Sequence, residues 1–154
     1  MYKFGLIIPC YDLENVLDID TFSKFLRLHP KYHLCFVNNG SKDKTLSLLE
    51  QLKFNEPRQV SVVDIKKKRG TSLVVRAGAR YLYTRGDLEC ISYMPIDVSQ
   101  DYTSIQKQLK SIVFEKTNSS NIDSKEVGKG SFEKRFFKNL SLLLYFLLNL
   151  TPFK

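Results

Sequence analysis

The feature that most constrains the fold of this 154-residue chain is an alternation, over its first two thirds, between short apolar runs and helix-length segments. The apolar runs have the length and composition of strands. The segments between them carry apolar residues at helical spacing, such as Phe22, Phe25 and Leu26. Because strands separated by helices require crossover connections, we predict an α/β fold with a mostly parallel sheet flanked by helices. The predicted strands are residues 4–9, 33–37, 59–65 and 88–94.

Capping residues and breakers define the predicted helices. Asp20 is predicted to cap the first helix, which Pro30 ends, and Asp43 is predicted to cap the second. In the second helix we expect Leu46, Leu49 and Leu52 to point inward. The predicted helices are residues 20–30, 43–54, 72–84 and about 103–116.

Composition narrows the class of protein without choosing a ligand. The net charge of +8 suits phosphate-bearing ligands, anionic lipid surfaces or nucleic acid. Cys10, Cys35 and Cys90 are odd in number, far apart and set in apolar runs, so we interpret them as reduced core thiols of a cytoplasmic protein. The chain is short for an enzyme that binds both a nucleotide-sized donor and a second substrate.

Polar and cationic segments follow all four predicted strands. In a parallel sheet the carboxyl ends of the strands meet at one edge, which is where ligands bind. The sequence therefore predicts a site for a phosphate-bearing ligand at that edge. The segments are "PCYDLEN", "NNGSKD", "KKKRGTS" and "PIDVSQ".

Several side chains of these segments could act on such a ligand. Asn39 is the one best placed to meet a base or ribose, and Gly40 allows a tight turn into a helix. Gly70 opens the third helix, and Arg76, about two turns later, could reach a diphosphate or be an ordinary surface arginine. Asp97 could ligate Mg²⁺ or Mn²⁺ through oxygen, although such an aspartate is also a common turn residue.

The chain divides by composition into three parts. Residues 1–116 form the predicted α/β domain, and residues 117–130 read as a polar loop. Residues 131–154 begin with basic and aromatic residues and become rich in leucine. Their apolar part is too short to span a bilayer, which needs about 20 residues. The composition therefore predicts either a helix on a membrane surface or a core helix.

The ordered motifs resemble those of family 2 glycosyltransferases with the GT-A fold. "IIPCYDLEN", "FVNNGSKDKTLSLLEQL", "KRGTSLVVRAGARY" and "YMPIDVSQ" are most similar to the dolichyl-phosphate mannose and glucose synthase branch, over roughly residues 4–102. The resemblance implies a Rossmann-like nucleotide-sugar-binding domain that is incomplete at its C-terminal end. It also implies a UDP- or GDP-sugar donor, Mg or Mn as cofactor, and a polyprenyl phosphate or other glycan acceptor.

The resemblance assigns roles residue by residue, with three replacements. The family has an aspartate at the position of Asn39, a lysine at that of Thr71 and the first carboxylate of a metal-binding pair at that of Pro95. Asp97 matches the second carboxylate and is the implied metal ligand. The implied donor-binding residues are Pro9, Tyr11, Glu14, Asn39, Gly70, Arg76 and Asp97.

Three functions compete at this stage. The first is a glycosyltransferase (a hexosyltransferase of cell-envelope glycan synthesis) that is cytoplasmic, either free or peripheral at the membrane face. The second is a truncated or degenerate relative that is inactive and binds nucleotide weakly. The third, a basic nucleic-acid-binding module, is disfavoured because the sequence has no signature of such a module and its basic residues gather at one strand-end edge.

Overall fold

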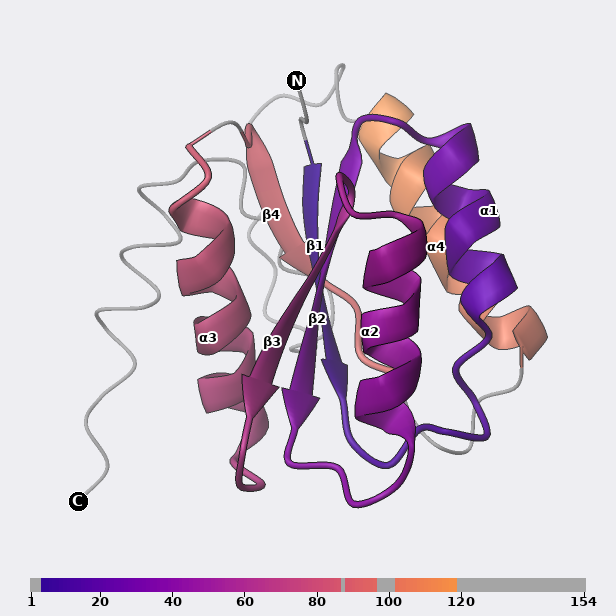
Figure 1. Cartoon of the computed structure of the whole chain (residues 1–154). Coiled ribbons are helices and arrows are strands. Elements are labelled where there is room, and N and C mark those ends of the chain that lie inside the picture. The colour runs from indigo at the N-terminus through magenta and orange to yellow at the C-terminus, as the bar shows by residue number, and fades with distance from the viewer. Residues whose placement is uncertain (1–3, 87, 97–101, 119–154) are drawn as a thin grey trace, which may run out of the picture.

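The computed structural model describes residues 4–86, 88–96 and 102–118, and its strands and helices alternate as the sequence predicts (Figure 1). The strands are all parallel and lie in the order β3-β2-β1-β4. The predicted α/β fold is therefore confirmed. The elements are β1 (Phe4–Cys10), α1 (Ile19–Leu28), β2 (Tyr32–Asn39), α2 (Thr45–Asn55), β3 (Val60–Ile65), α3 (Thr71–Tyr83), β4 (Cys90–Tyr93) and α4 (Tyr102–Asn118).

Strands β1 and β2 form the buried centre of the sheet. They pair in register from Phe4 opposite Tyr32 to Cys10 opposite Asn38. Every residue of β2 is buried, which explains its continuous apolar run, because a central parallel strand is covered on both faces. All three cysteines are buried and form no disulfide, as expected of core thiols, and burial raises the pKa of Cys35 to about 12.

The two faces of the sheet are covered unequally. Figure 1 shows α1, α2 and α4 on one face and α3 on the other. Phe22, Leu49 and Ile105, one from each of the three helices, pack on the first face. The second face packs against α3 through Val74 and Leu82.

A glycine sets how closely α3 approaches the sheet. A Cβ atom at Gly78 would lie 2.7 Å from Cγ2 of Ile7 and 2.9 Å from Cγ2 of Val37. Any larger residue would therefore push the helix away from the two central strands. This close packing fixes the distance between the middle of α3 and the two central strands.

Two helix starts differ from the prediction. Helix α1 is capped by Asp18, whose carboxylate accepts hydrogen bonds from the backbone N–H and the hydroxyl of Thr21, and Asp20 lies in its first turn. The sequence offers an aspartate at both positions, and only the extended backbone at Asp18 decides between them. Helix α2 begins after Lys44 rather than Asp43. The Asp43 carboxylate accepts from the backbone N–H of Thr45 and also from that of Glu14 in a neighbouring loop.

Other predictions concern residues outside the described part of the chain. Asp97 and the segment from residue 119 onward, which includes most of the predicted loop and all of residues 131–154, are not described. Within the described residues, none of the helices is both long enough and apolar enough to cross a membrane.

Candidate functional site

The ends of all four strands point to the same edge of the sheet, as parallel pairing requires (Figure 1). Strand β1 ends at Cys10, β2 at Asn39, β3 at Ile65 and β4 at Tyr93. The polar segments that follow them therefore gather there, as the sequence predicts. We refer to this side of the molecule as the carboxyl edge.

The loops after β1 and β2 are fastened together by reciprocal hydrogen bonds. The backbone N–H of Asp12 donates to Oγ of Ser41 over 3.1 Å, and the backbone N–H of Lys42 donates to Oδ1 of Asp12 over 2.8 Å. Asp12 has a φ of 49°, a left-handed conformation that aspartate tolerates better than most residues. In each of the two loops, a side chain thus accepts a hydrogen bond from the backbone of the other loop.

A second pair of bonds joins the same loops around Asp43. Its Oδ2 accepts from the backbone N–H of Glu14 and its Oδ1 from that of Thr45, each over 2.9 Å. In return, Oε2 of Glu14 accepts from the backbone N–H of Lys44 over 2.9 Å. Burial by itself raises the pKa of Asp43, but the hydrogen bonds from Thr45 and Glu14 outweigh it and leave the pKa lowered. Asp43 is therefore an ionised component of the loop structure.

This arrangement occupies the amides at the start of α2. The backbone N–H groups of Lys42 and Lys44 donate to carboxylates of the β1 loop, so they already have anionic partners. A phosphate would have to displace those carboxylates. The start of α2 is consequently a poor place for a diphosphate in this structure.

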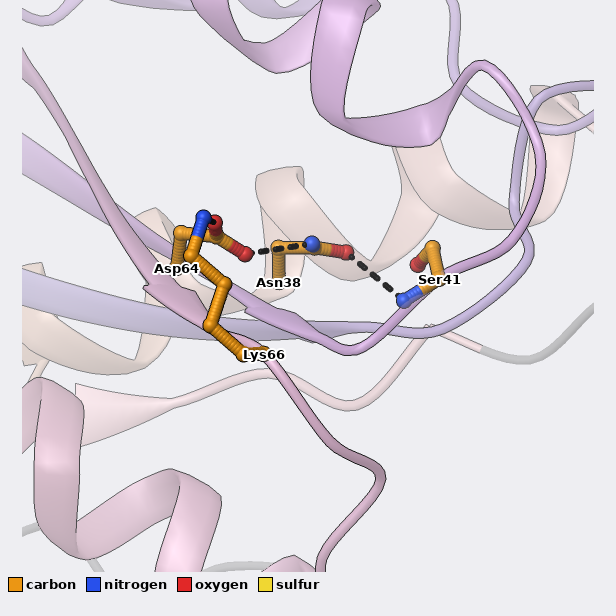
Figure 2. A network of polar contacts seen from close by, with 4 residues as sticks. All are labelled: Asn38, Ser41, Asp64 and Lys66. Atoms are coloured by element: carbon orange, nitrogen blue, oxygen red, sulfur yellow. Dashed lines mark hydrogen bonds and ion pairs between the residues drawn. The ribbon is translucent and has the colours of Figure 1, made fainter.

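The ends of β2 and β3 are joined by a polar network that the sequence analysis did not single out (Figure 2). Nδ2 of Asn38 donates to Oδ1 of Asp64 over 2.8 Å, and Oδ1 of Asn38 accepts from the backbone N–H of Ser41 over 3.4 Å. Lys66 pairs with Asp64, and this contact, followed by the bond from Asn38, lowers the pKa of Asp64. The sequence signal for it was an aspartate near the end of an apolar predicted strand, directly before a run of cations.

Asn39 is engaged with the loop after β3. Its Nδ2 donates to the backbone carbonyl of Arg69 over 2.9 Å, and its Oδ1 accepts from the backbone N–H of Arg69 over 2.7 Å. The side chain is buried, with a relative exposure of 8%. The amide that we expected to meet a base or ribose thus has both a donor and an acceptor partner within the protein.

The start of α3 is the more suitable anion site. Gly70 is its N-cap and supplies no side-chain hydrogen bond, and the first turn contains no acidic residue. Lys66, Lys67, Lys68 and Arg69, directly before it, are exposed. Backbone N–H groups at an uncapped helix start favour anions, and neighbouring cations strengthen that preference.

Arg76, in the second turn of α3, has an unsatisfied donor. Its side chain is half-buried, and its Nε is buried without a hydrogen-bond partner. A buried donor without a partner carries a cost of about 1–3 kcal/mol, which a bound acceptor would remove. Arg76 therefore has the chemistry expected of an anion-binding arginine.

The remaining predicted site residues are placed as follows. Pro9 is half-buried near the end of β1, and the ring of Tyr11 lies 3.6 Å from Nζ of Lys68 in a cation–π contact. Thr71 and Pro95 are exposed. In the part of the chain that the structure describes, His, Cys, Asp and Glu form no group of three that could hold a metal ion.

A parallel α/β sheet with polar and cationic loops at its carboxyl edge has the architecture of a nucleotide-binding domain. The sequence model of glycosyl transferase family 2 matches residues 6–152. Because the match covers nearly the whole chain, this protein belongs to glycosyltransferase family 2.

Curated relatives are also glycosyltransferases by name. The chain is 28% identical over 83 residues to the uncharacterized glycosyltransferase YkcC of Bacillus subtilis, covering 51% of this chain and 25% of that protein. It is 31% identical over 83 residues to the uncharacterized glycosyltransferase sll0501 of Synechocystis, covering 51% of this chain and 26% of that protein. The matched region is thus about a quarter of the length of each relative.

Solved structures support the fold. The structure of TarS 1-349 from S. aureus in complex with UDP is similar with a TM-score of 0.51 and 15% identity, over 86% of this chain and 40% of that one. At that identity the similarity establishes a shared architecture and not a shared substrate. The expected GT-A class is confirmed at the level of fold.

Proposed function

We propose that this chain binds the diphosphate of a UDP- or GDP-sugar at its carboxyl edge and takes part in transferring the sugar. The observation that carries the proposal is the start of α3, where an uncapped helix end, the cations before it and the unpartnered Nε of Arg76 lie in one short segment. A diphosphate supplies acceptors for the backbone N–H groups at the helix start and for Nε of Arg76, and opposite charge for the exposed cations. Membership of family 2 supplies the reaction class.

A divalent metal, Mg²⁺ or Mn²⁺, would depend on Asp97. The carboxylates described at the carboxyl edge, those of Asp12, Glu14, Asp43 and Asp64, all accept hydrogen bonds from the protein itself. A metal held by Asp97 would neutralise charge on the diphosphate. Pro95 offers no oxygen in its side chain, so the metal would lack one of the two carboxylates usual in the family.

The branch of the family and the acceptor are assigned from the sequence resemblance. We assign the chain to the dolichyl-phosphate mannose and glucose synthase branch, with a polyprenyl phosphate or other glycan as acceptor, in cell-envelope glycan synthesis. Residues 131–154 would contact the membrane as a surface helix, placing the protein on the cytoplasmic face. The basic and leucine-rich composition of that segment supports this assignment.

The second candidate is a relative that binds nucleotide weakly and is catalytically inactive. Three charged groups of the family pattern are replaced, by Asn39, Thr71 and Pro95. Each lost charge-assisted contact costs about 1.5–3 kcal/mol. If the losses add, they exceed about 4 kcal/mol, which corresponds to roughly a thousandfold in affinity.

Titration calorimetry of the full chain with UDP and GDP, with and without Mn²⁺, tests both candidates. We expect weak binding that strengthens with metal and falls at least about tenfold in Arg76→Ala, since a charged hydrogen bond is lost. Arg80→Ala, on the exposed surface of the same helix, is the matched control. Absence of binding to either nucleotide would contradict the proposed donor site, and sub-micromolar metal-dependent binding abolished by Asp97→Ala would exclude the degenerate candidate.

Restoring the family residues provides the complementary experiment. The double variant Thr71→Lys/Pro95→Asp regains one cation and one carboxylate at exposed positions. We expect it to bind UDP or GDP more tightly in the presence of Mn²⁺ than the unchanged chain does. No gain would mean that the carboxyl edge does not hold the diphosphate in the way the family does.

A further inference from the structure

The segment that forms α3 and its leading loop carries charge of one sign only. From Lys66 to Gly86 there are seven basic residues and no acidic one, so this segment contributes +7 of the net charge of +8. In contrast, α1, α2 and α4 each contain at least one acidic residue. The basic residues are Lys66, Lys67, Lys68, Arg69, Arg76, Arg80 and Arg85.

Apolar side chains are exposed among these cations. Leu73 is 51% exposed and Tyr83 is 42% exposed. At 3.6 residues per turn, Leu73, Arg80 and Tyr83 lie within an arc of about 80° and span about 15 Å along the helix. The opposite side of α3 packs on the sheet through Val74 and Leu82, so this arc points away from the core (Figure 1).

We propose that this surface docks on the anionic surface of a phospholipid bilayer. We call it the basic α3 face and define it as loop residues 66–69 with Leu73, Arg80 and Tyr83. Each cation near an anionic bilayer strengthens binding about fivefold. Leucine and tyrosine side chains between the cations enter the headgroup region, as on membrane-surface helices.

The apolar component favours lipid over nucleic acid as the partner. A phosphate backbone would attract the same cations but would give no favourable environment to Leu73. A bilayer surface satisfies both kinds of side chain at once. Docking there would also bring the loop that opens α3, and with it the carboxyl edge, next to the lipid. The inference rests on charge and exposure and does not require the proposed glycosyl transfer.

Vesicle co-sedimentation of the full chain tests the proposal, using phosphatidylcholine vesicles with and without phosphatidylglycerol. We expect binding only to the anionic vesicles, and a loss of at least about tenfold in Leu73→Ser/Arg80→Glu/Tyr83→Ser. The matched control is Leu28→Ser/Lys53→Glu/Phe54→Ser, which removes two exposed apolar groups and one cation from the other side of the sheet. Circular dichroism confirms that both variants are folded.

A fluorescent reporter gives a second measurement that needs no disruptive variant. The chain contains no tryptophan, so Tyr83→Trp and Phe54→Trp each introduce a single emitter. Anionic vesicles should shift the emission of the Tyr83→Trp protein to shorter wavelength and leave that of the Phe54→Trp protein unchanged. Equal vesicle binding by both triple variants, equal shifts in both reporters, or release from vesicles by competing duplex DNA would overturn the proposal. These samples contain no nucleotide-sugar, so their failure leaves the glycosyltransferase proposal intact.

Discussion

The two halves of the carboxyl edge differ in whether their polar groups bond within the protein or remain exposed. The first half, the loops after β1 and β2, is closed by hydrogen bonds among its own side chains and backbone, with Asp12, Glu14 and Asp43 as acceptors. The second half, the segments after β3 and β4, presents exposed residues, among them Thr71 and Pro95. The first half satisfies its carboxylates internally. The cations of the second half stay exposed, although Lys66 pairs with Asp64 and Lys68 lies over the ring of Tyr11.

This contrast explains where the chain departs from the family pattern. In the first half Asp43 holds two loops together, so losing its carboxylate would cost stability. Thr71 and Pro95 replace charged residues at exposed positions, where the described structure makes no use of a charge. Asn39 lies between these cases, because its amide has acquired a structural partner in Arg69.

The largest effect should follow a change at the junction of the two halves. Gly40 has a φ of 69°, and a Cβ atom there would lie 2.7 Å from the backbone N of Lys68. Gly40→Ala should lower the free energy of unfolding by about 2–4 kcal/mol, from left-handed strain and the backbone clash. Urea denaturation measures this. Gly86→Ala, at the same φ of 69° but in open space, isolates the strain and should cost less.

The interlocked loops should be nearly as sensitive. Asp43→Ala leaves the N–H groups of Glu14 and Thr45 without their partner and should lower the free energy of unfolding by about 2 kcal/mol. Urea denaturation at neutral pH is the measurement. A loss below about 0.5 kcal/mol, the size typical of surface changes, would show that the loops are not held by this carboxylate.

The same carboxylate predicts an effect of pH. Because the folded pKa of Asp43 is lowered, its stabilisation is present above the unfolded pKa of about 3.9 and is lost as the pH falls through that value toward the folded pKa. Asp43→Asn removes the titrating group, so its stability should fall less steeply between pH 5 and pH 3, taken as roughly one unit on either side of that value. Identical acid profiles for the two proteins would contradict this account.

A smaller effect is expected from restoring the family residue at position 39. In Asn39→Asp the carboxylate still accepts from the Arg69 N–H but cannot donate to the Arg69 carbonyl. We expect a loss of about 1–2 kcal/mol in the free energy of unfolding at neutral pH. Asn39→Ala, which removes both bonds, should be at least as unstable. Greater stability of the aspartate variant would mean that the Arg69 carbonyl does not need this donor.

The smallest effect should come from the exposed half of the edge. Thr71→Lys and Pro95→Asp change side chains at exposed positions, so each should alter the free energy of unfolding by less than about 0.5 kcal/mol. Thermal melts of each single variant without nucleotide provide the measurement. A change comparable to that of Asp43→Ala would remove the distinction between the two halves.

The sequence by itself determined the order of elements, the parallel sheet and the edge at which polar groups gather. It could do so because the spacing of apolar residues and the turn-forming residues after each strand are local signals, which can be recognised without tertiary information. The end of α1 before Pro30, the turn at Gly40 and the burial of Leu49 and Leu52 in α2 are all confirmed on this basis. The sequence could not predict that Asp18 rather than Asp20 caps α1, because both residues are aspartates.

Only the tertiary structure decided what each polar side chain bonds to. Asp43 was predicted as a cap, yet its carboxylate reaches the N–H of Glu14 from 29 residues away. Asn38 and Asp64, 26 residues apart, become partners because neighbouring strands end side by side. Hydrogen-bond partners depend on distances between segments remote in sequence, and no periodicity encodes those distances. The pattern therefore located the site, and the packing of loops determined which of its groups remain available to a ligand.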